Sequence, residues 1–483
     1  MAEKAKSNSE MIFIIITLIL MIGFGFIPPV LDLTPSGMRI LGVLFGVIFG
    51  CSFCSSTAWP CLLGMVVLIM TGVSNAAAVL SAGIGNDSIW LMTFFFVFVA
   101  VLEEAQITGV MANWIISMKI IRRRPWVYLF ILMFGTFFVG AIGLSFPAMI
   151  LFWNILMKTC KEFDVKPFSA YPTVGFIGIA IAGLASSSLW TFMGNPLFVS
   201  AMLSSISGGV YSLNTGIYAL FSLILWLVLF AVYILLFKFI MRVDVSSLKE
   251  IDAPSEKGAQ LSKRQKAILV YTALVLVMYC GKGLVPAASA LGVWLSALGS
   301  SFPLVLVIAL MCITRVDGAF LCNFSQAARN GVVWDTVILA GSLLALSTIM
   351  MTTDTGVQET ILKVLSPVFA GHGLVFMTII ICVVSVILTN FMANTTVGLM
   401  FTPVIYSFSQ TMGFNPLPVI AIMTISIHIA YMTPAASPYA SLLFGYSSEW
   451  VKKGDLYKYG LISCVAITIC MLLAGIPLSK LMF

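Results

Sequence analysis

Two long apolar segments of this chain are each interrupted near the middle by small and polar residues. The first, 383–408, reads VVSVILTNFMANTTVGLMFTPVIYSF and is interrupted at 389–396. The second, 420–446, reads IAIMTISIHIAYMTPAASPYASLLFGY and is interrupted at 432–438. Because a lipid-exposed backbone must pair its amides and carbonyls internally, an interrupted helix is stable only inside protein or beside an aqueous cavity. Two such interruptions in succession are typical of a transport site near the bilayer midplane.

Apolar residues make up 60% of the 483 residues, and charged residues only 9%. Since one membrane span needs about 20 apolar residues, this composition predicts an all-α polytopic membrane protein with about 11 transmembrane helices. The segment 11–28 is long enough to span and lacks a small-residue cleavage site, so we expect it to remain as the first helix. The net charge of +7 does not indicate a nucleic acid partner, because the basic residues lie at loop ends, where membrane orientation places them.

The order of segments predicts two repeats of inverted topology, each with a re-entrant helical hairpin and a broken transmembrane helix. Trp90 and Trp334 each open an apolar segment that reaches Thr-Gly-Val, at 108–110 and at 355–357, an offset of 355 − 108 = 247. We place the first repeat at 1–240, a polar cytoplasmic linker at 241–266 and the second repeat at 267–483. The expected hairpins and broken helices are, in chain order, about 126–157, about 173–205, about 370–409 and about 417–446.

Basic residues indicate the orientation in the membrane. Lys4 precedes the first helix and Arg122–Arg124 follow four expected spans, so both positions fall on the cytoplasmic side. An odd number of crossings in each repeat inverts the second copy. We therefore expect a protein of the cytoplasmic membrane with its N-terminus in the cytoplasm and its C-terminus outside.

The polar breaks suit a small anion. No Asp, Glu, Lys or Arg occurs from Val364 to Ser448, so an anion there would be held without a fixed cationic side chain. Helix N-termini each supply about half a positive charge and free amides, which can hold a carboxylate or sulfate. The alternative is that the breaks are ordinary kinks whose Ser and Thr satisfy the backbone. We expect the substrate site to contain Ser145, Thr191, Gly194, Asn195, Pro196, Asn394, Thr395, Ser437 and Pro438.

A sodium ion would need oxygen ligands from the unwound backbone and from hydroxyl or amide side chains. The second-half breaks offer such oxygens, and no other cofactor is expected. The candidate sodium ligands are Ala393, Asn394, Thr396, Thr433 and Ala436.

The segments LTNFMANTTVGLMFTPVI and MTPAASPYASLLFG resemble the second hairpin and the second broken helix of the divalent anion/sodium symporter family, within the ion-transporter superfamily. The resemblance implies a homodimer with an elevator-type moving domain that carries di- or tricarboxylates or sulfate. The family's Ser-Asn-Thr tip becomes Ala393-Asn394-Thr395 here, and Ala440 replaces an Asn. In the first hairpin, Leu144-Ser145-Phe146 stands at the tip. We therefore expect any sodium ion to sit mainly at the second-half site.

The leading prediction is thus a sodium-coupled secondary transporter of organic anions, with sodium-independent anion exchange and proton-coupled transport as alternatives. His428 lies near the second break and is a candidate for substrate contact or proton coupling. Glu103, Glu104 and Asp354 lie at span ends and are expected to be interfacial. An enzyme is not expected, because the sequence contains no HExxH or GxSxG motif.

Two further expectations concern single features. Cys51 and Cys54 form a lone CxxC, which we interpret as packing rather than as a metal or redox site. We also expect 11–76 and the spans near 216–314 to form a dimeric scaffold around the moving hairpins and broken helices.

Overall fold

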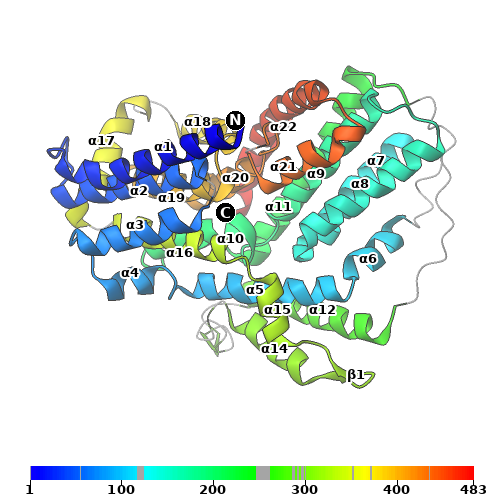
Figure 1. Cartoon of the computed structure of the whole chain (residues 1–483), viewed down its shortest axis with the longest axis horizontal. Coiled ribbons are helices and arrows are strands. Elements are labelled where there is room, and N and C mark those ends of the chain that lie inside the picture. The colour runs from blue at the N-terminus through cyan, green and yellow to red at the C-terminus, as the bar shows by residue number, and fades with distance from the viewer. Residues whose placement is uncertain are drawn as a thin grey trace.

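The computed structural model describes residues 2–54, 56–116, 124–245, 261–285, 289–290, 293–294, 299, 301–350, 353–369, 373–434 and 436–483. The described chain is almost wholly helical (Figure 1), and its one strand pair, β1 (Arg315–Val316) with β2 (Ala319–Phe320), is a short hairpin. The protein is an all-α polytopic membrane protein. The predicted basic cluster at Arg122 and Arg123, and most of the predicted linker, lie outside the described residues.

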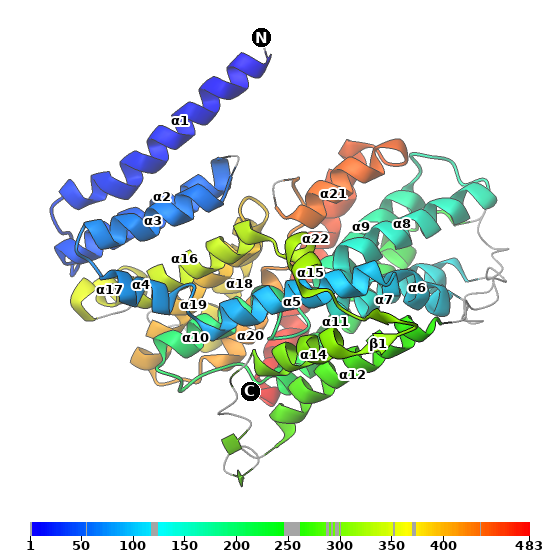
Figure 2. The same ribbon diagram turned by 60° about the horizontal axis from the view of Figure 1, so that its bottom comes forward.

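The two halves of the chain begin with the same order of elements. In the first half these are α1 (Ala2–Gly23), α2 (Pro35–Phe53), α3 (Ala58–Met70), α4 (Ala76–Ala82), α5 (Asp87–Glu104) and α6 (Ile107–Ile116). In the second half they are α12 (Lys263–Leu284), α14 (Phe302–Ile313), α15 (Phe324–Gly331), α16 (Trp334–Met350) and α17 (Val357–Phe369). The short helix and the long helix after it are bent by 51° at α4–α5 and by 74° at α15–α16. Helix α1 has no counterpart among the described elements of the second half, and it lies at the edge of the molecule beside α2 (Figure 2).

The first hairpin consists of α7 (Pro125–Val139), a π-turn at Gly140–Leu144 and α8 (Ser145–Glu162). Gly143 has a φ of +95°, a conformation that glycine adopts without steric cost. The hydroxyl oxygens of Tyr128 and Thr159 lie 2.6 Å apart. In a straight helix these two residues would be about 46 Å apart at 1.5 Å per residue. The chain therefore turns back at Gly143, and α7 and α8 lie antiparallel.

In both halves of the chain a hairpin is followed by a broken helix. The first broken helix consists of α9 (Ala170–Ser186) and α10 (Gly194–Ile206), separated by a first break at 187–193. The second hairpin consists of α18 (Leu374–Thr389) and α19 (Asn394–Met412), and the second broken helix of α20 (Leu417–Ser426) and α21 (Pro438–Tyr446), separated by a second break at 427–437. The start of the hairpin expected at 370–409 lies at 370–372, outside the described residues.

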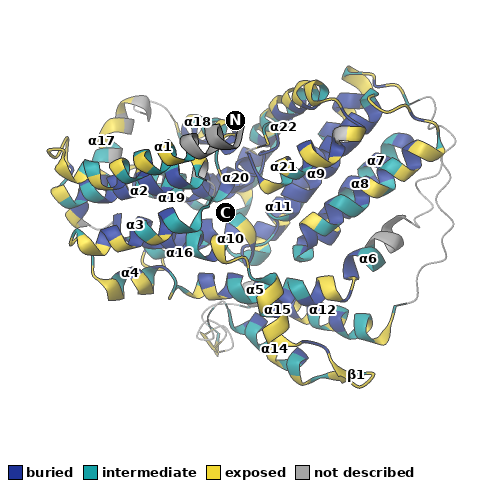
Figure 3. Ribbon diagram, in the orientation of Figure 1, coloured by how far each residue is buried: buried dark blue, intermediate teal, exposed yellow. Residues whose placement is uncertain are grey.

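Helices α9 and α20 form the centre of this unit. Every residue of α9 from Tyr171 to Ser186 is buried, and so is every residue of α20 from Pro418 to Ser426. Figure 3 shows this burial in contrast to the exposed faces of α1 and α17. A helix that is apolar on all sides packs against protein or against lipid, and the burial of these two shows that the other elements pack around them.

Each broken helix is also held by a long helix that follows it. Helix α11 (Thr215–Leu235) donates from Tyr233 Oη to the carbonyl oxygen of Val174 at 2.6 Å, and from Trp226 Nε1 to Ser188 Oγ at 2.7 Å. Helix α22 (Lys453–Met482) meets the second break through Ser463 Oγ, 3.2 Å from Tyr431 Oη. The span near 216–237, which the sequence analysis assigned to the scaffold, is joined by buried hydrogen bonds to the first broken helix and also packs against α12; its assignment to either unit stays a prediction.

By length and hydropathy alone, three described segments could cross a membrane, at Pro125–Glu162, Thr215–Ile240 and Lys453–Met482, and the two bent pairs raise this to five. The first of these segments is the folded-back hairpin, so it is not a single span. Shorter apolar helices occur at Glu10–Phe26, Pro35–Cys51, Ala58–Met70, Ala170–Ser186, Phe302–Ile313, Leu374–Thr389 and Leu417–Ser426. The number of about 11 spans stays a prediction.

Candidate functional site

Four helix N-termini meet at the hairpin tips and the breaks. Helix α8 begins at Ser145, α10 at Gly194, α19 at Asn394 and α21 at Pro438. The rings of Phe146 in α8 and Tyr439 in α21 stack, with centroids 4.3 Å apart. The hydroxyl of Thr395 in α19 donates to Asn195 Oδ1 in α10 at 2.7 Å. Each hairpin tip therefore contacts the half-helix of the opposite repeat.

The first tip is joined to the first broken helix by hydroxyl groups. Ser145 Oγ lies 2.8 Å from Ser186 Oγ, at the end of α9, and 3.2 Å from the carbonyl oxygen of Gly140. Trp190 Nε1, in the first break, donates to the carbonyl oxygen of Ala141 at 2.8 Å. The backbone that the π-turn and the break leave open is thus paired inside the protein.

A cavity of about 360 Å³ lies beside this tip. It is lined by Ser145, Phe146, Ser187, Gly194, Tyr439 and Glu103, among others. Gly194 has a φ of +61°, and a side chain there would meet the carbonyl oxygen of Ser187. The glycine therefore lets the first break pass close to α10 and leaves the cavity open.

The second tip uses its side chains to satisfy the second break. The hydroxyl of Thr389 lies 2.8 Å from the carbonyl oxygen of Ile427 and 2.9 Å from Asn394 Oδ1, and its single hydrogen donates to one of them. Asn390 Nδ2 donates to the carbonyl oxygen of Ile429 at 2.8 Å, and Asn390 Oδ1 accepts from the Met432 amide at 2.8 Å. The carbonyls exposed by the break at Ile427 and Ile429 are therefore already within reach of protein donors.

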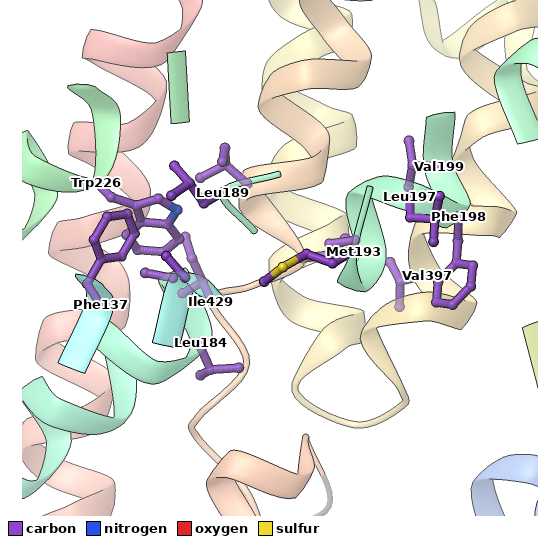
Figure 4. Packing of buried hydrophobic residues seen from close by; sticks show 14 of the residues in the cluster. Phe137, Leu184, Leu189, Met193, Leu197, Phe198, Val199, Trp226, Val397 and Ile429 are labelled. Atoms are coloured by element: carbon purple, nitrogen blue, oxygen red, sulfur yellow. The ribbon is translucent and has the colours of Figure 1, made fainter. Parts of the chain in front are cut away.

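Three elements meet at Asn195, the second residue of α10. Its Nδ2 lies 3.1 Å from His428 Nε2 in the second break, and its Oδ1 accepts from Thr395. His428 Nδ1 lies 2.7 Å from the carbonyl oxygen of Thr424, and the histidine is 1% exposed. Figure 4 shows the apolar surroundings, with Met193 just before α10 placed between Ile429 of the second break and Val397 of α19.

The remaining expected substrate residues have local partners. Thr191 Oγ1 lies 2.6 Å from Thr215 Oγ1, at the start of α11, and Pro196 is buried in the first turn of α10. Ser437 Oγ donates to the carbonyl oxygen of Ala430 at 2.8 Å and accepts from the Ala440 amide at 3.1 Å. Pro438 begins α21, where its missing N–H costs nothing.

The candidate sodium ligands lie in different surroundings. Thr396 is buried and lines a gap between α19, α2 and α16. Thr433 donates its hydroxyl to the carbonyl oxygen of Asn390 at 2.6 Å, and Ala436 packs with Ala430 and Ala440. Ala393 precedes α19 and is exposed.

Four further residues that make contacts in this region were not predicted from the sequence: Thr389, Asn390, Ser186 and Tyr439. Thr389 and Asn390 lie within the polar interruption at 389–396, so the sequence could have indicated them. Tyr439 directly follows Pro438, and no local sequence feature marks it as a site residue. Its contact with Phe146 joins residues that are far apart in the chain and depends on the fold.

The acidic residues take different positions. Glu104 Oε1 lies 2.7 Å from Arg264 Nη2, and both side chains are partly exposed. Glu103 lines the cavity, and the backbone oxygen of Asp354 accepts from Thr34 Oγ1 at 2.7 Å. Among the residues that the structure describes, no cluster of three or more His, Cys, Asp or Glu could hold a metal.

Cys51, of the lone CxxC, has another cysteine as its neighbour. Its Sγ lies 3.5 Å from Cys61 Sγ, in α3. Cys54 Sγ instead lies 3.9 Å from Thr17 Oγ1, in α1.

The helix N-termini at the meeting point favour an anion. Neither α10 nor α19 has a side-chain cap, since Met193 and Ala393 stand at their N-caps. Uncapped first-turn amides and the helix dipole both attract negative charge. The described lining of the cavity contains no Lys or Arg, and its polar groups are helix N-termini, hydroxyl groups, the amide of Asn330 and the carboxyl group of Glu103.

Comparisons with known proteins add the family. A sequence model described as "Citrate transporter" (CitMHS) matches residues 43–425. An uncharacterized transporter of Escherichia coli, YfbS, is 26% identical over 187 residues, 35% of this chain and 30% of its own length. The Na(+)/citrate cotransporter of Rattus norvegicus is 28% identical over 137 residues, 28% of this chain and 23% of its own length. The chain thus spans less than a third of either relative.

The fold is similar to that of a solved transporter structure. The YdaH transporter of Alcanivorax borkumensis superposes with a TM-score of 0.57 at 12% sequence identity. The superposition covers 86% of this chain and 88% of that one.

Proposed function

Because the chain belongs to the citrate transporter family, and is a transporter rather than an enzyme, we propose that it is a secondary active transporter of di- or tricarboxylates. The observation that carries this proposal is that four helix N-termini meet in two contacting pairs, α8 with α21 and α10 with α19, and that three of them line the cavity. Such N-termini compensate a carboxylate with backbone amides. The substrate named for the rat relative, citrate, belongs to the same class.

The proposed site lies between the two repeats. It contains Asn195 and Thr395 where α10 meets α19, and Ser145 and Gly194 where the cavity adjoins them. Asn394, Ser437 and Pro438 complete the N-termini of α19 and α21. Thr191 lies in the first break, where it contacts Thr215, and Pro196 lies in the first turn of α10.

We further propose an elevator-type movement and a homodimer in the cytoplasmic membrane, with the N-terminus in the cytoplasm and the C-terminus outside. Both hairpins, both broken helices, α11 and α22 would move as one body, since hydrogen bonds join each hairpin and each of these two long helices to a broken helix. Helices α2, α3, α5 and α16 would belong to the scaffold. The moving body and the scaffold would not coincide with the two repeats, because each of them contains elements of both repeats.

Sodium coupling is the favoured form of this transport, and the rat relative is named as a sodium cotransporter. The ion would sit at the second tip, near Asn394 and Thr433. One observation favours anion exchange as a second candidate. The hydroxyl of Thr433 and the amide of Asn390 are already paired within the protein, so an ion would have to compete for their oxygens.

Uptake into proteoliposomes tests these proposals. Labelled citrate, succinate and sulfate are offered with and without an inward sodium gradient, and with and without internal anion. We expect uptake of citrate or succinate that a sodium gradient drives. Uptake only with internal anion would instead identify an exchanger, and no uptake of any of the three would contradict the proposed function.

A further inference from the structure

His428 is a buried histidine whose hydrogen bonds determine its tautomer. Its Nδ1 lies 2.7 Å from the carbonyl oxygen of Thr424, which can only accept, so Nδ1 carries a hydrogen. In the neutral ring Nε2 is then an acceptor. The neighbouring Asn195 amide, 3.1 Å away, accordingly donates from Nδ2.

The orientation of Asn195 in turn determines what Thr395 does. With Nδ2 turned to His428, Asn195 presents Oδ1 to Thr395, and the hydroxyl hydrogen of Thr395 is used in this bond at 2.7 Å. Thr395 and Asn195 are both half-buried, whereas His428 is 1% exposed. The state of the buried ring is therefore transmitted to two half-buried side chains where α10 meets α19.

We propose that His428 takes up a proton when the carboxylate substrate binds, and that the Asn195 amide turns over to couple the two events. This inference rests on the proposed function. An imidazolium donates from both nitrogens, so its Nε2–H requires Oδ1 of Asn195 in place of Nδ2. The turned amide then donates from Nδ2 to Thr395 Oγ1. The Thr395 hydroxyl hydrogen is thereby released and can donate to the substrate carboxylate.

The charge balance requires proton and anion to bind together. The helices packed against α20 are α10, α18, α19 and α22. Helices α10, α18 and α19 carry no Asp, Glu, Lys or Arg, and α22 carries Lys453, Asp455 and Lys458 near its start and Lys480 near its end. The other titratable groups on these elements and in the second break are Cys382, Tyr406, Tyr431, Tyr457, Tyr459, Cys464 and Cys470.

A buried cation without a partner is costly, whereas a nearby anion compensates it. Without substrate His428 is therefore neutral. When the substrate binds, its carboxylate is the anionic partner that compensates the charge of the imidazolium. Since the bound state holds one more proton than the free state, affinity rises as pH falls. The expected change is up to about tenfold in Kd per pH unit where the free histidine is neutral.

Calorimetry on the purified full-length protein measures this proton directly. Succinate and citrate are titrated at about pH 7.5 in two buffers of different ionisation enthalpy, with sodium held constant. The difference in heat gives the protons taken up per bound anion. We expect a net uptake of up to one proton in the wild type. We expect none in His428→Gln, whose amide oxygen can accept from Asn195 but does not titrate.

A second pair of variants tests the proposal even if the His428→Gln variant fails to fold. Thr395→Val removes the hydroxyl and should weaken binding and flatten the dependence of Kd on pH, whereas Thr395→Ser should restore both. Equal proton uptake in wild type and His428→Gln, or a wild-type Kd that does not change with pH, would overturn the proposal. If neither acid bound to the wild-type protein, the proposed function itself would fail, which is a distinct result.

Discussion

Phe146 of the first hairpin and Tyr439 of the second broken helix stack with ring planes 10° apart. The two residues come from opposite repeats and both line the cavity. In the divalent anion/sodium symporters that the sequence resembles, the expected tip has polar residues here. In this chain an aromatic pair holds the first tip against α21, and the tip's polar contribution is reduced to Ser145.

The aromatic pair should position the substrate site. Tyr439→Ala removes the stack, whose contribution is about 0.5–1.5 kcal/mol, so we expect the KM for carboxylate uptake to rise about two- to tenfold. Tyr439→Phe keeps the ring and serves as the matched control. Initial rates of citrate and succinate uptake give both constants, and equal KM values for the two variants would contradict a role of the stack.

Asn390 should contribute mainly to stability. Asn390→Ala leaves the Ile429 carbonyl and the Met432 amide without their partner, at a cost of about 1–3 kcal/mol for each buried group left unpaired. We expect a clearly lower Tm of the purified protein in detergent. The control is Gln326→Ala, which removes an exposed amide and should leave Tm unchanged. An unchanged Tm in Asn390→Ala would show that water or a neighbour replaces these bonds.

Movement of the hairpins past the scaffold can be blocked by a crosslink. Leu44 of α2 and Met400 of α19 line the same gap between scaffold and second hairpin. With Cys at both positions in a background without other accessible thiols, a short bifunctional reagent should abolish uptake but leave citrate binding intact.

The matched control for that crosslink lies within the moving body. Tyr128 and Thr159 are in contact inside the first hairpin, so a crosslink between Cys residues there should leave uptake unaffected. Normal uptake by the Leu44–Met400 crosslinked protein would contradict the elevator proposal.

Sodium dependence should be shallow. The first tip offers one side-chain hydroxyl, at Ser145, so we expect a Hill coefficient for Na⁺ of about one, or no dependence in an exchanger. Asn394→Ala should remove whatever dependence exists. Ser145→Ala should instead weaken carboxylate affinity by about two- to tenfold. A steep dependence with a Hill coefficient of about three would mean that the first tip also holds an ion.

The hairpins and broken helices could be predicted from the sequence because local residues cause them. Gly143, Gly194 and Pro438 each stand where the backbone turns or a half-helix begins. The neighbours of the span near 216–237 could not be predicted, since its sequence is apolar on every face. Only the fold places Trp226 against Ser188.

The site was predicted less completely for a related reason. Asn195 and Asn394 could be named because they stand at polar breaks. The sequence did not indicate that Asn390 would occupy the carbonyls freed by the second break, because that pairing joins residues 39 positions apart in two different elements. The sequence predicted sodium ligands at Thr433 and Ala436, whereas the carbonyl that Asn390 pairs is that of Ile429.

The bond between Asn195 and His428 has a consequence for how the protein is made. The two residues are 233 positions apart, so the first broken helix is synthesised and inserted long before its partner exists. Until then, the amide of Asn195 must be satisfied by water or by the insertion machinery. A chain truncated before the second break should therefore insert its first half with Asn195 still hydrated, and the two halves become joined here only when synthesis has passed His428.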